Sequence, residues 1–445
     1  MRLHKLLFYF FLILTFCVNA QSNYKLTDKI KSQKIEFELI NNIILIPVEV
    51  NGITLKFLLD TGVSKPILFN FIKGSDSLKI LNSEKIKIKG LGDGDYIDAL
   101  RSSHNTFKIG DAINTDQTLF AVFDSRINLA PKLGTPIDGI IGYDLFKDFV
   151  VEVNYSGRYI RLHNPEHYKY KRCNRCEVLD LEFKDNRPYL NTNVTIKDKL
   201  VPVKLLMDSG GSDALWLFED KDKGLQHSDK YFEDFLGSGL SGDVFGKRTK
   251  IEALNLNRFT IKYPKVAFPD SVTVKAVKKF KDRDGTIGGE ILKRFNLIVD
   301  YSNSKITLKK NSTFHDAFSY NKSGLQVEHD GVRVVMEINV EENSAHIRSE
   351  QSNSIAVNSV VKTNRNFSLK PTFIVHNVVK NSPAYWAGVK KGDVILTINN
   401  KITFDLTLDR IVNHFYKKSG TQIRLLVNRN GYEKEIKFRL KSPIE

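Results

Sequence analysis

An internal repeat constrains this 445-residue chain more than any other feature of its sequence. The segment LKFLLDTGVSKPILF (55–69) recurs as VKLLMDSGGSDALWLF (203–218). Further along, IDGIIGYDLFKDFVVEVNYSGRYIRLHN (137–164) recurs as RDGTIGGEILKRFNLIVDYSNSKITLKKN (283–311). The copies are offset by 148 residues at Asp60 and by 146 residues at Asp138. A register kept over that distance indicates two copies of one folding unit.

Each copy has the composition of a β-rich lobe. Short runs of β-branched and aromatic residues, such as IILIPVEV and YIRLH, are separated by Gly, Asn and Asp, which favours strands and turns over an α/β sheet. Two glycine-rich stretches, KGLGDGDY (89–96) and LGSGLSGDVFG (236–246), predict one hairpin with a mobile tip in each copy. One short helix is expected after each GxIG turn, at YDLFKDF and GEILKRF.

The two Asp-Thr/Ser-Gly turns, each after an apolar strand, resemble those of the aspartic proteases of the pepsin and retropepsin clan. The resemblance covers roughly residues 35 to 310 and implies a mainly β, bilobal double-β-barrel fold. It makes Asp60-Thr61-Gly62 and Asp208-Ser209-Gly210 the catalytic turns, with 140–142 and 286–288 as the supporting hydrophobic-hydrophobic-Gly elements. A retropepsin monomer has one such turn and must dimerise. This chain has both, so we expect a complete site in a monomer.

The chemistry implied by the resemblance needs two neighbouring carboxyl groups, here those of Asp60 and Asp208. Carboxyl groups about 3 Å apart cannot both ionise at low cost, so one stays protonated and the pair activates water without a metal or other cofactor. In the family, hydroxyls of the turns bond across the lobe interface, and glycines allow a tight turn where a side chain would clash. The corresponding residues are Thr61, Ser209, Gly62 and Gly210.

One departure from the family concerns the residue that follows each turn. Pepsin-like lobes often place a hydroxyl residue there to hydrogen-bond the carboxylate, whereas this sequence has Val63 and Gly211. Fewer hydrogen bonds to the anion leave its pKa less depressed, which predicts a mildly acidic to near-neutral optimum. The glycine-rich hairpins are candidate flaps, with Tyr96 as the candidate flap tyrosine or, equally well, an ordinary strand aromatic.

A second pattern begins at about Ser323. It comprises SPAYWAGVKKGDVILTINN (382–400), a helix-like LTLDRIVNHFYKK and the strand-like segments QIRLLVNRN and YEKEIKFRL. Over roughly 75 residues this resembles the bacterial type of α+β PDZ domain. The resemblance implies a short helix containing Ala384 and Ala387-Gly388, a turn at Gly392-Asp393 and strands at 373–379 and 395–398.

PDZ domains bind a peptide C-terminus as an added strand at a sheet edge, with loop N–H groups on the carboxylate. By resemblance, this loop is Ser323-Gly324-Leu325. A polar stretch at about 340–370, rich in Asn, Ser and Glu, is expected to be an insertion or flexible loop. The domain either tethers substrates or partners near the cleft or serves only for docking.

The first residues predict export. Arg2 and Lys5 precede an apolar run over 6–18 and a small-residue site ending at Ala20, as in a secretory signal peptide. The run is shorter than the roughly 20 residues of a membrane-spanning helix, so we expect a periplasmic, cell-surface or secreted protein with no transmembrane segment after cleavage. A lipoprotein anchored through Cys17 is the second interpretation, although Phe16 is large for it.

The two other cysteines, Cys173 and Cys176, predict a local disulfide or an idle thiol pair in an oxidising compartment. The alternative is a zinc site completed by His163 and His167; we expect no metal. The expected division of the chain is a signal peptide over 1–20, a linker over 21–34, lobe 1 over 35–170, lobe 2 over 171–312 and a PDZ domain over 320–445.

The charge of the chain raises the question of anionic partners. The net charge of +16 comes from lysines scattered over strands and turns, with no nucleic-acid-binding motif, so we exclude nucleic acid as a partner. The motifs HExxH and GxSxG are absent, which disfavours zinc and serine hydrolases. The sequence predicts an aspartic endopeptidase acting on peptide or protein substrates. The alternative is a non-catalytic peptide-binding or sensing protein that uses the same cleft and PDZ groove.

Overall fold

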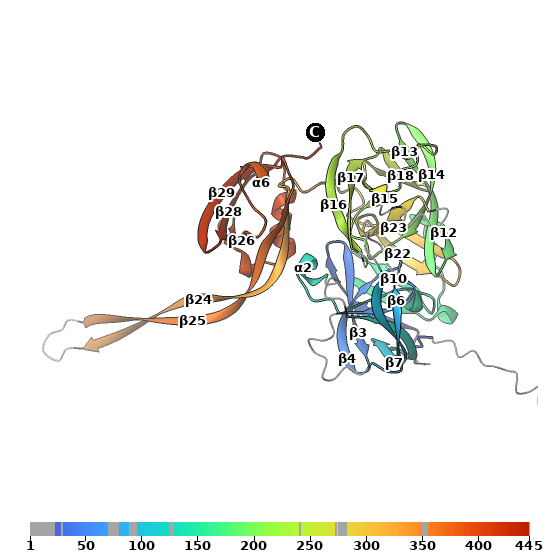
Figure 1. Cartoon of the computed structure of the whole chain (residues 1–445). Helices are drawn as coiled ribbons and strands as arrows, with labels where there is room; N and C mark the ends of the chain where they lie inside the picture. The colour runs from blue at the N-terminus through green and yellow to red at the C-terminus, as the bar shows by residue number, and fades with distance from the viewer. Residues whose placement is uncertain are drawn as a thin grey trace, which may run out of the picture.

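The computed structural model describes residues 23–27, 30–69, 80–88, 96–123, 129–239, 242–271, 274, 283–348 and 355–444. The expected signal peptide lies outside these residues. Two β lobes are followed by a third, smaller β unit, and the fold is mainly β as the sequence predicts (Figure 1). None of the helices in the described ranges is long and apolar enough to span a membrane.

Lobe 1 is built on an eight-stranded sheet with the order β2-β3-β4-β9-β5-β8-β7-β6. Its strands are β2 (Glu38–Ile40), β3 (Ile43–Val50), β4 (Ile53–Leu59), β5 (Ile67–Leu68), β6 (Ser83–Ile88), β7 (Ile97–Ile109), β8 (Ala112–Val122) and β9 (Gly139–Ile141). Two short helices, α2 (Ala130–Leu133) and α3 (Tyr143–Phe146), flank β9 in the sequence. The helix expected at YDLFKDF is α3.

A six-stranded antiparallel layer joins the lobes. It runs in the order β1 (Ser32–Glu36), β11 (Tyr159–His163), β10 (Val150–Asn154), β22 (Phe295–Asp300), β23 (Lys305–Lys310) and β12 (Cys176–Lys184). The seam is the pairing of β10 with β22, in which Val151 faces Val299. These strands bury their apolar residues in one core cluster that spans both lobes, so the lobes form a single packed body.

Lobe 2 continues from this layer and repeats the plan of lobe 1. Its other strands are β13 (Arg187–Ile196), β14 (Lys199–Met207), β15 (Leu215–Leu217), β16 (Phe232–Gly239), β17 (Gly242–Lys250), β18 (Ala253–Leu256), β19 (Phe259–Lys262), β20 (Lys265–Pro269) and β21 (Gly285–Ile287). Helix α5 (Gly289–Leu292) follows β21 and corresponds to α3. The glycine-rich segments form the predicted hairpins β6–β7 and β16–β17, although 89–95 and 240–241 at their tips lie outside the described residues.

The third unit is a PDZ-like sheet with the order β24-β25-β26-β28-β29, with β27 on β26. Its elements are β24 (Leu325–Arg348), β25 (Ile355–Val378), α6 (Pro383–Trp386), β26 (Val394–Ile398), β27 (Lys401–Ile402), η3 (Thr403–Asp405), α7 (Leu408–Asn413), η4 (His414–Tyr416), β28 (Gln422–Arg429) and β29 (Tyr432–Arg439). A separate apolar cluster fills its core. Helix α6 ends at Trp386, so Ala387 is its C-cap and Gly388, at φ 82°, lies beyond it.

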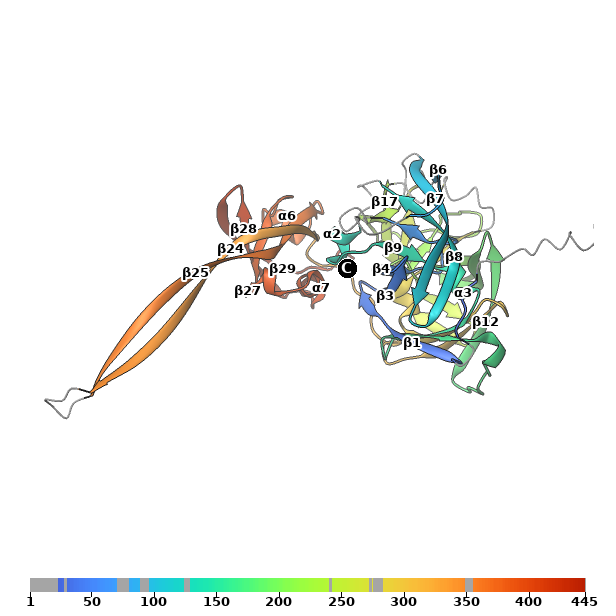
Figure 2. The ribbon, with the colours of Figure 1, turned by 90° about the horizontal axis from the view of Figure 1, so that it is seen from below.

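The polar stretch expected to be an insertion or flexible loop is a regular structure. Strands β24 and β25 pair along their whole lengths, from Leu325 opposite Val378 to Arg348 opposite Ile355, and the outer part projects away from the rest of the molecule (Figures 1 and 2). The flexible-loop alternative is therefore wrong for the described part of 340–370. Sequence composition missed it because cross-strand pairing satisfies backbone groups even where both strands are polar.

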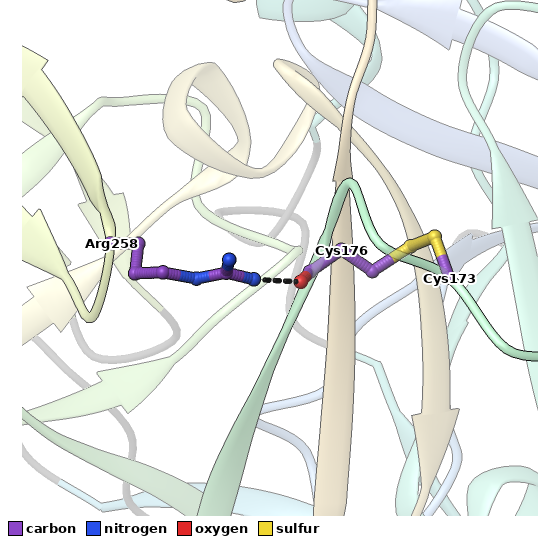
Figure 3. Close-up of a disulfide and its surroundings, with 3 residues drawn as sticks. All are labelled: Cys173, Cys176 and Arg258. Carbon is purple, nitrogen blue, oxygen red and sulfur yellow. Dashed lines mark hydrogen bonds between the residues drawn. A yellow bond between two sulfur atoms is a disulfide. The ribbon is translucent and has the colours of Figure 1, made fainter.

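The joint between the lobes contains η2 (Pro165–His167) and a disulfide between Cys173 and Cys176 (Figure 3). Arg258 of lobe 2 donates from Nη2 to the carbonyl oxygen of Cys176 at 2.9 Å. Because the two sulfurs are bonded to each other, the zinc alternative is wrong for this structure. His163 instead contacts the Glu152 carboxylate at 3.4 Å, and no group of three or more His, Cys, Asp or Glu within the described ranges is arranged for a metal.

Candidate active site

The lobe 1 turn lies at the carboxyl end of a buried parallel strand pair. Strand β4 runs beside β9 with Leu58 next to Ile140, and the paired segments Phe57–Leu59 and Gly139–Ile141 are buried. The Asp60 amide donates to the carbonyl oxygen of Ile141 at 2.8 Å. The chain then reverses over Thr61 and Gly62. The predicted supporting element thus holds the backbone of the predicted catalytic turn.

Lobe 2 builds its turn in the same way. Strand β14 runs parallel to β21 with Leu206 next to Thr286, and the Asp208 amide donates to Ile287 O at 3.0 Å. Further down the strands, Asp138 exchanges backbone and carboxylate hydrogen bonds with Lys56, and Asp284 does the same with Lys204, all at 2.8 to 2.9 Å. The repeat seen in the sequence is therefore a repeat of hydrogen bonds.

Hydroxyl groups tie the two turns to each other. Thr61 Oγ1 donates to Met207 O at 2.7 Å and accepts from Ser209 N at 3.0 Å. Reciprocally, Ser209 Oγ donates to Leu59 O at 2.8 Å and accepts from Thr61 N at 3.0 Å. Both side chains are buried, and each oxygen uses its donor and its acceptor capacity. This arrangement holds the turns, from opposite lobes, at a fixed separation.

The carboxyl groups of Asp60 and Asp208 meet at the centre of this arrangement, since a Cβ placed on Gly62 would lie 3.1 Å from Asp60 Oδ1 and 3.7 Å from Asp208 Oδ1. Each accepts one backbone hydrogen bond, from Gly62 N to Asp60 Oδ1 at 2.6 Å and from Gly211 N to Asp208 Oδ1 at 2.8 Å. Burial and the neighbouring Asp208 carboxylate raise the pKa of Asp60 well above its ordinary value. The pair therefore retains a proton under conditions in which an isolated aspartate has lost it.

The close approach of the two turns requires a glycine more strictly in lobe 2 than in lobe 1. A Cβ on Gly210 would lie 2.5 Å from both Cγ and Oδ2 of Asp60 in the other lobe, which fits the predicted clash. A Cβ on Gly62 would lie 3.1 Å from Asp60 Oδ1 and 3.5 Å from Asp208 Cγ, which is much less crowded. The turn of lobe 2 thus closes against the carboxyl group of lobe 1.

Two arginines that sequence reasoning missed lie beside the pair. Arg187, at the start of β13, donates from Nε to Gly62 O at 3.0 Å, and its charge opposes the rise in the Asp60 pKa. Arg283 donates from Nε to Gly285 O at 3.0 Å and from Nη2 to Thr286 Oγ1. Burial lowers its pKa to about 10 despite the favourable charge of Asp208. No local motif marks Arg187, because it reaches the lobe 1 turn from lobe 2. Arg283 begins the repeated segment 283–311 and bonds Gly285 and Thr286, so its position beside the supporting element could have drawn attention to it.

The other predicted site residues lie away from this centre. Tyr96 precedes β7, its side chain is 63% exposed, and most of its hairpin tip falls outside the described residues. In the PDZ domain, Ser323 is buried and its Oγ accepts from the Leu325 amide at 2.9 Å, while Gly324 has a φ of 77°. The predicted carboxylate loop is therefore a formed turn before the edge strand β24.

Comparisons with known proteins agree with these two regions. Residues 46–145 match the model of the aspartyl protease family, and residues 323–440 match that of the PDZ domain. Among solved structures, an aspartic proteinase from Irpex lacteus covers 64% of this chain and 99% of its own, with 14% identity and a TM-score of 0.42. The chain has an aspartic protease-like region followed by a PDZ domain.

Matches to curated proteins are short. A protein of Thermotoga maritima named as a zinc metalloprotease is 40% identical over 64 residues, which are 14% of this chain and 12% of that protein. A CtpA-like serine protease of Staphylococcus haemolyticus is 33% identical over 66 residues, which are 15% of this chain and 13% of that protein. Because the chain spans so little of these relatives and their names give two catalytic classes, neither assigns a catalytic type here.

Proposed function

We propose that this chain is an aspartic endopeptidase in which Asp60 and Asp208 activate water to hydrolyse peptide bonds. The observation that carries the proposal is the close approach of these two carboxyl groups, supplied by different lobes and held by the reciprocal bonds of Thr61 and Ser209. A purely structural pair of turns has no need to bring two half-buried acidic groups together, because that approach costs free energy unless one group stays protonated.

The asymmetry of the pair suggests a division of labour. With its pKa raised by burial and by Asp208, Asp60 keeps the shared proton and donates it to the carbonyl oxygen of the scissile bond. Asp208 then accepts a proton from the attacking water. The tetrahedral intermediate forms without a covalent enzyme intermediate, and the proton on Asp208 passes to the leaving amine.

The pH range of the reaction follows from the same contacts. Each carboxylate has one backbone hydrogen bond from its own turn, and residues 63 and 211 add no hydroxyl. Few donors leave the anion weakly stabilised, and we propose a mildly acidic to near-neutral optimum. A pH-rate profile peaking below about pH 3 would contradict this part of the proposal.

The PDZ domain is proposed to recruit peptide or protein partners at the edge strand β24, which would raise their concentration near the protease lobes. We further propose that the protein acts outside the cytoplasm, in the periplasm, at the cell surface or in the medium. The signal-like residues 1–20 support this location, and so does the bond between Cys173 and Cys176, because disulfides persist in oxidising compartments.

The test is cleavage of a peptide library by the purified protein and by two variants, Asp60→Asn and Asp208→Asn. Each substitution keeps the size of the side chain but removes an ionisable oxygen, so we expect kcat/KM to fall at least about 1000-fold. Asp111→Asn, in the exposed turn between β7 and β8, is the matched control and should cleave normally.

Two results would oppose the proposal. Unchanged cleavage by both aspartate variants would remove the dyad mechanism. A folded wild-type protein that binds library peptides and cleaves none across the pH range would favour the non-catalytic peptide-binding alternative.

A further inference from the structure

The beginning of the edge strand of the PDZ sheet faces the protease-like lobes rather than open solvent. Strand β24 is the terminal strand of its sheet, and its first residues line a pocket of about 440 Å³ together with residues of lobe 2. Leu325 and Gln326 form one wall, and Phe232 and Asp234 of strand β16 form another. Gln326 Nε2 donates to Asp234 Oδ1 at 3.5 Å. The predicted carboxylate loop therefore opens into a pocket between the domains.

Further along, a segment of lobe 1 lies against the same edge. Helix α2 lies beside β24 (Figure 2). Gly134, at the C-terminal end of α2, lies against Leu408, the first residue of α7. Strand β24 and helix α7 also contact each other. The segment 130–134 thus touches both elements between which, by resemblance to other PDZ domains, a peptide strand would lie.

The contact at Gly134 depends on the absence of a side chain. Gly134 has a φ of 69°, and a Cβ there would lie 2.7 Å from the Cβ of Leu408. That atom sits next to the backbone of α7, so it cannot swing aside as the end of a long side chain would. A glycine that both ends α2 and permits this approach indicates a fitted contact.

The same segment is linked to the catalytic lobes on its other side. Three residues after Gly134 the chain enters Ile137 and then β9, whose last residue accepts the amide hydrogen of Asp60. Lys132 lies over the ring of Phe235 at 4.8 Å and 3.9 Å from Asp243, both on the hairpin β16–β17. A displacement of α2 would therefore act on a candidate flap and on the support of Asp60.

We infer that the segment 130–134 is an intramolecular occupant of the peptide-binding edge of the PDZ domain, and that an external peptide competes with it for β24. This inference rests on the proposed peptide binding of the PDZ domain but not on proteolysis. Binding of a peptide C-terminus displaces α2 and releases its contacts with the hairpin β16–β17. The chain would therefore have two states, one with α2 docked on β24 and one with α2 displaced by a bound peptide.

The decisive variant is Gly134→Asn in the full-length protein. Asparagine tolerates the left-handed backbone, so its main effect is the new Cβ against Leu408, which pushes the segment off α7. The matched control is Gly52→Asn, at φ 91° in lobe 1, where an added Cβ meets nothing within 4 Å. Both variants carry the same new side chain in a similar backbone conformation.

Hydrogen exchange measured by mass spectrometry reads the docking directly. We expect the amides of 325–329 and 130–134 to exchange faster in Gly134→Asn than in Gly52→Asn or the wild type, with no peptide present. Equal exchange in the three proteins would overturn the inference. This readout is independent of peptide affinity and of catalysis.

Binding is measured with a fluorescein-labelled decapeptide ending in a free valine carboxylate, with the C-terminal amide as the negative probe. If the segment covers the edge in nine of ten molecules, its removal tightens the apparent Kd about tenfold, and only Gly134→Asn should show this gain. Saturating peptide should also speed exchange of 130–134 in the wild type. A peptide bound equally by all three proteins, with that exchange unchanged, would show that the two ligands do not compete.

Discussion

The two lobes of the protease-like region share a fold but differ in charge around their aspartate turns. Five residues after the aspartate, lobe 1 has Lys65 and lobe 2 has Asp213. Lys65 binds the buried carboxylate of Asp144 at 3.0 and 3.1 Å. Asp213 instead accepts from Arg248 at 2.9 Å and from Trp216 at 2.7 Å. Equivalent positions of the repeat thus carry opposite charges.

The two lobes neutralise the carboxylates behind their turns with different side chains. In lobe 1, Gln117 also donates to Asp144 at 2.8 Å, so the acid keeps a neutral partner beside Lys65. In lobe 2, Arg248 holds both Asp213 and Asp234, the latter at 2.7 Å. Burial opposes ionisation of Asp213, but the charge and hydrogen bonds of Arg248 bring its pKa below the ordinary value.

The comparison shows which parts of the duplicated unit must be the same in both lobes and which can differ. The parallel strand pairs, the turns and the crossed hydroxyls are the same in both lobes because they position two carboxyl groups. Ion pairs behind the turns only need to satisfy buried charge, and several solutions do so. The lobe 2 network also lines the interdomain pocket, where Asp213, Asp234 and Arg248 face the PDZ domain.

The largest expected effect is the loss of the lobe 2 cation. Arg248→Met leaves two largely buried carboxylates, which are 21% and 18% exposed, without their partner, so we expect the free energy of unfolding to fall by about 3–5 kcal/mol. The matched change in lobe 1, Lys65→Met, should cost about 1–2 kcal/mol, because Lys65 is partly exposed and Asp144 keeps its bond from Gln117. Urea unfolding measures both. Equal losses would mean that the two ion-pair networks contribute equally to the free energy of unfolding, which would contradict the prediction.

The next effect compares the two glycines of the turns. In Gly210→Ala the new methyl group displaces the Asp60 carboxyl group, so kcat/KM should fall at least about 100-fold. Gly62→Ala should lose only about tenfold or less, because its nearest contacts are longer and can relax. Neither glycine has a left-handed φ, so backbone strain does not enter the comparison. A larger loss in Gly62→Ala would contradict the assigned crowding.

The smallest effect concerns the pH dependence. Arg187 holds the pKa of Asp60 lower than burial and Asp208 alone would set it. Removing this cation in Arg187→Gln raises the Asp60 pKa. Because Asp60 is the proposed proton donor and must stay protonated, the alkaline limb of the pH-rate profile should move to higher pH. Arg187→Lys keeps the charge but not the planar donor, so it should restore the position of the limb more than the maximal rate. An alkaline limb that is unmoved in Arg187→Gln would contradict an electrostatic effect of Arg187 on the pair.

Much of the site was predictable because it is local. A tight turn after an apolar strand, with Asp, a hydroxyl residue and Gly in order, uses residues within a few positions of one another, and its repetition 148 residues later marks the partner. The helices α3 and α5 and the hairpins of both lobes were predictable from similarly short patterns. The long arm of β24 and β25 was not, because its polar composition did not reveal that these two consecutive strands pair along their whole lengths.

The sequence by itself determined that two equivalent lobes each carry one acidic turn and that a PDZ domain follows, because repeats and turn motifs are written in consecutive residues. Only the tertiary structure decided that Arg187 and Arg283 lie beside the acidic pair and that 130–134 lies on the PDZ edge. These contacts join segments that no periodicity relates. These contacts form only when the folded domains pack together, because burial and electrostatic interactions depend on distances in space and not on separation along the chain.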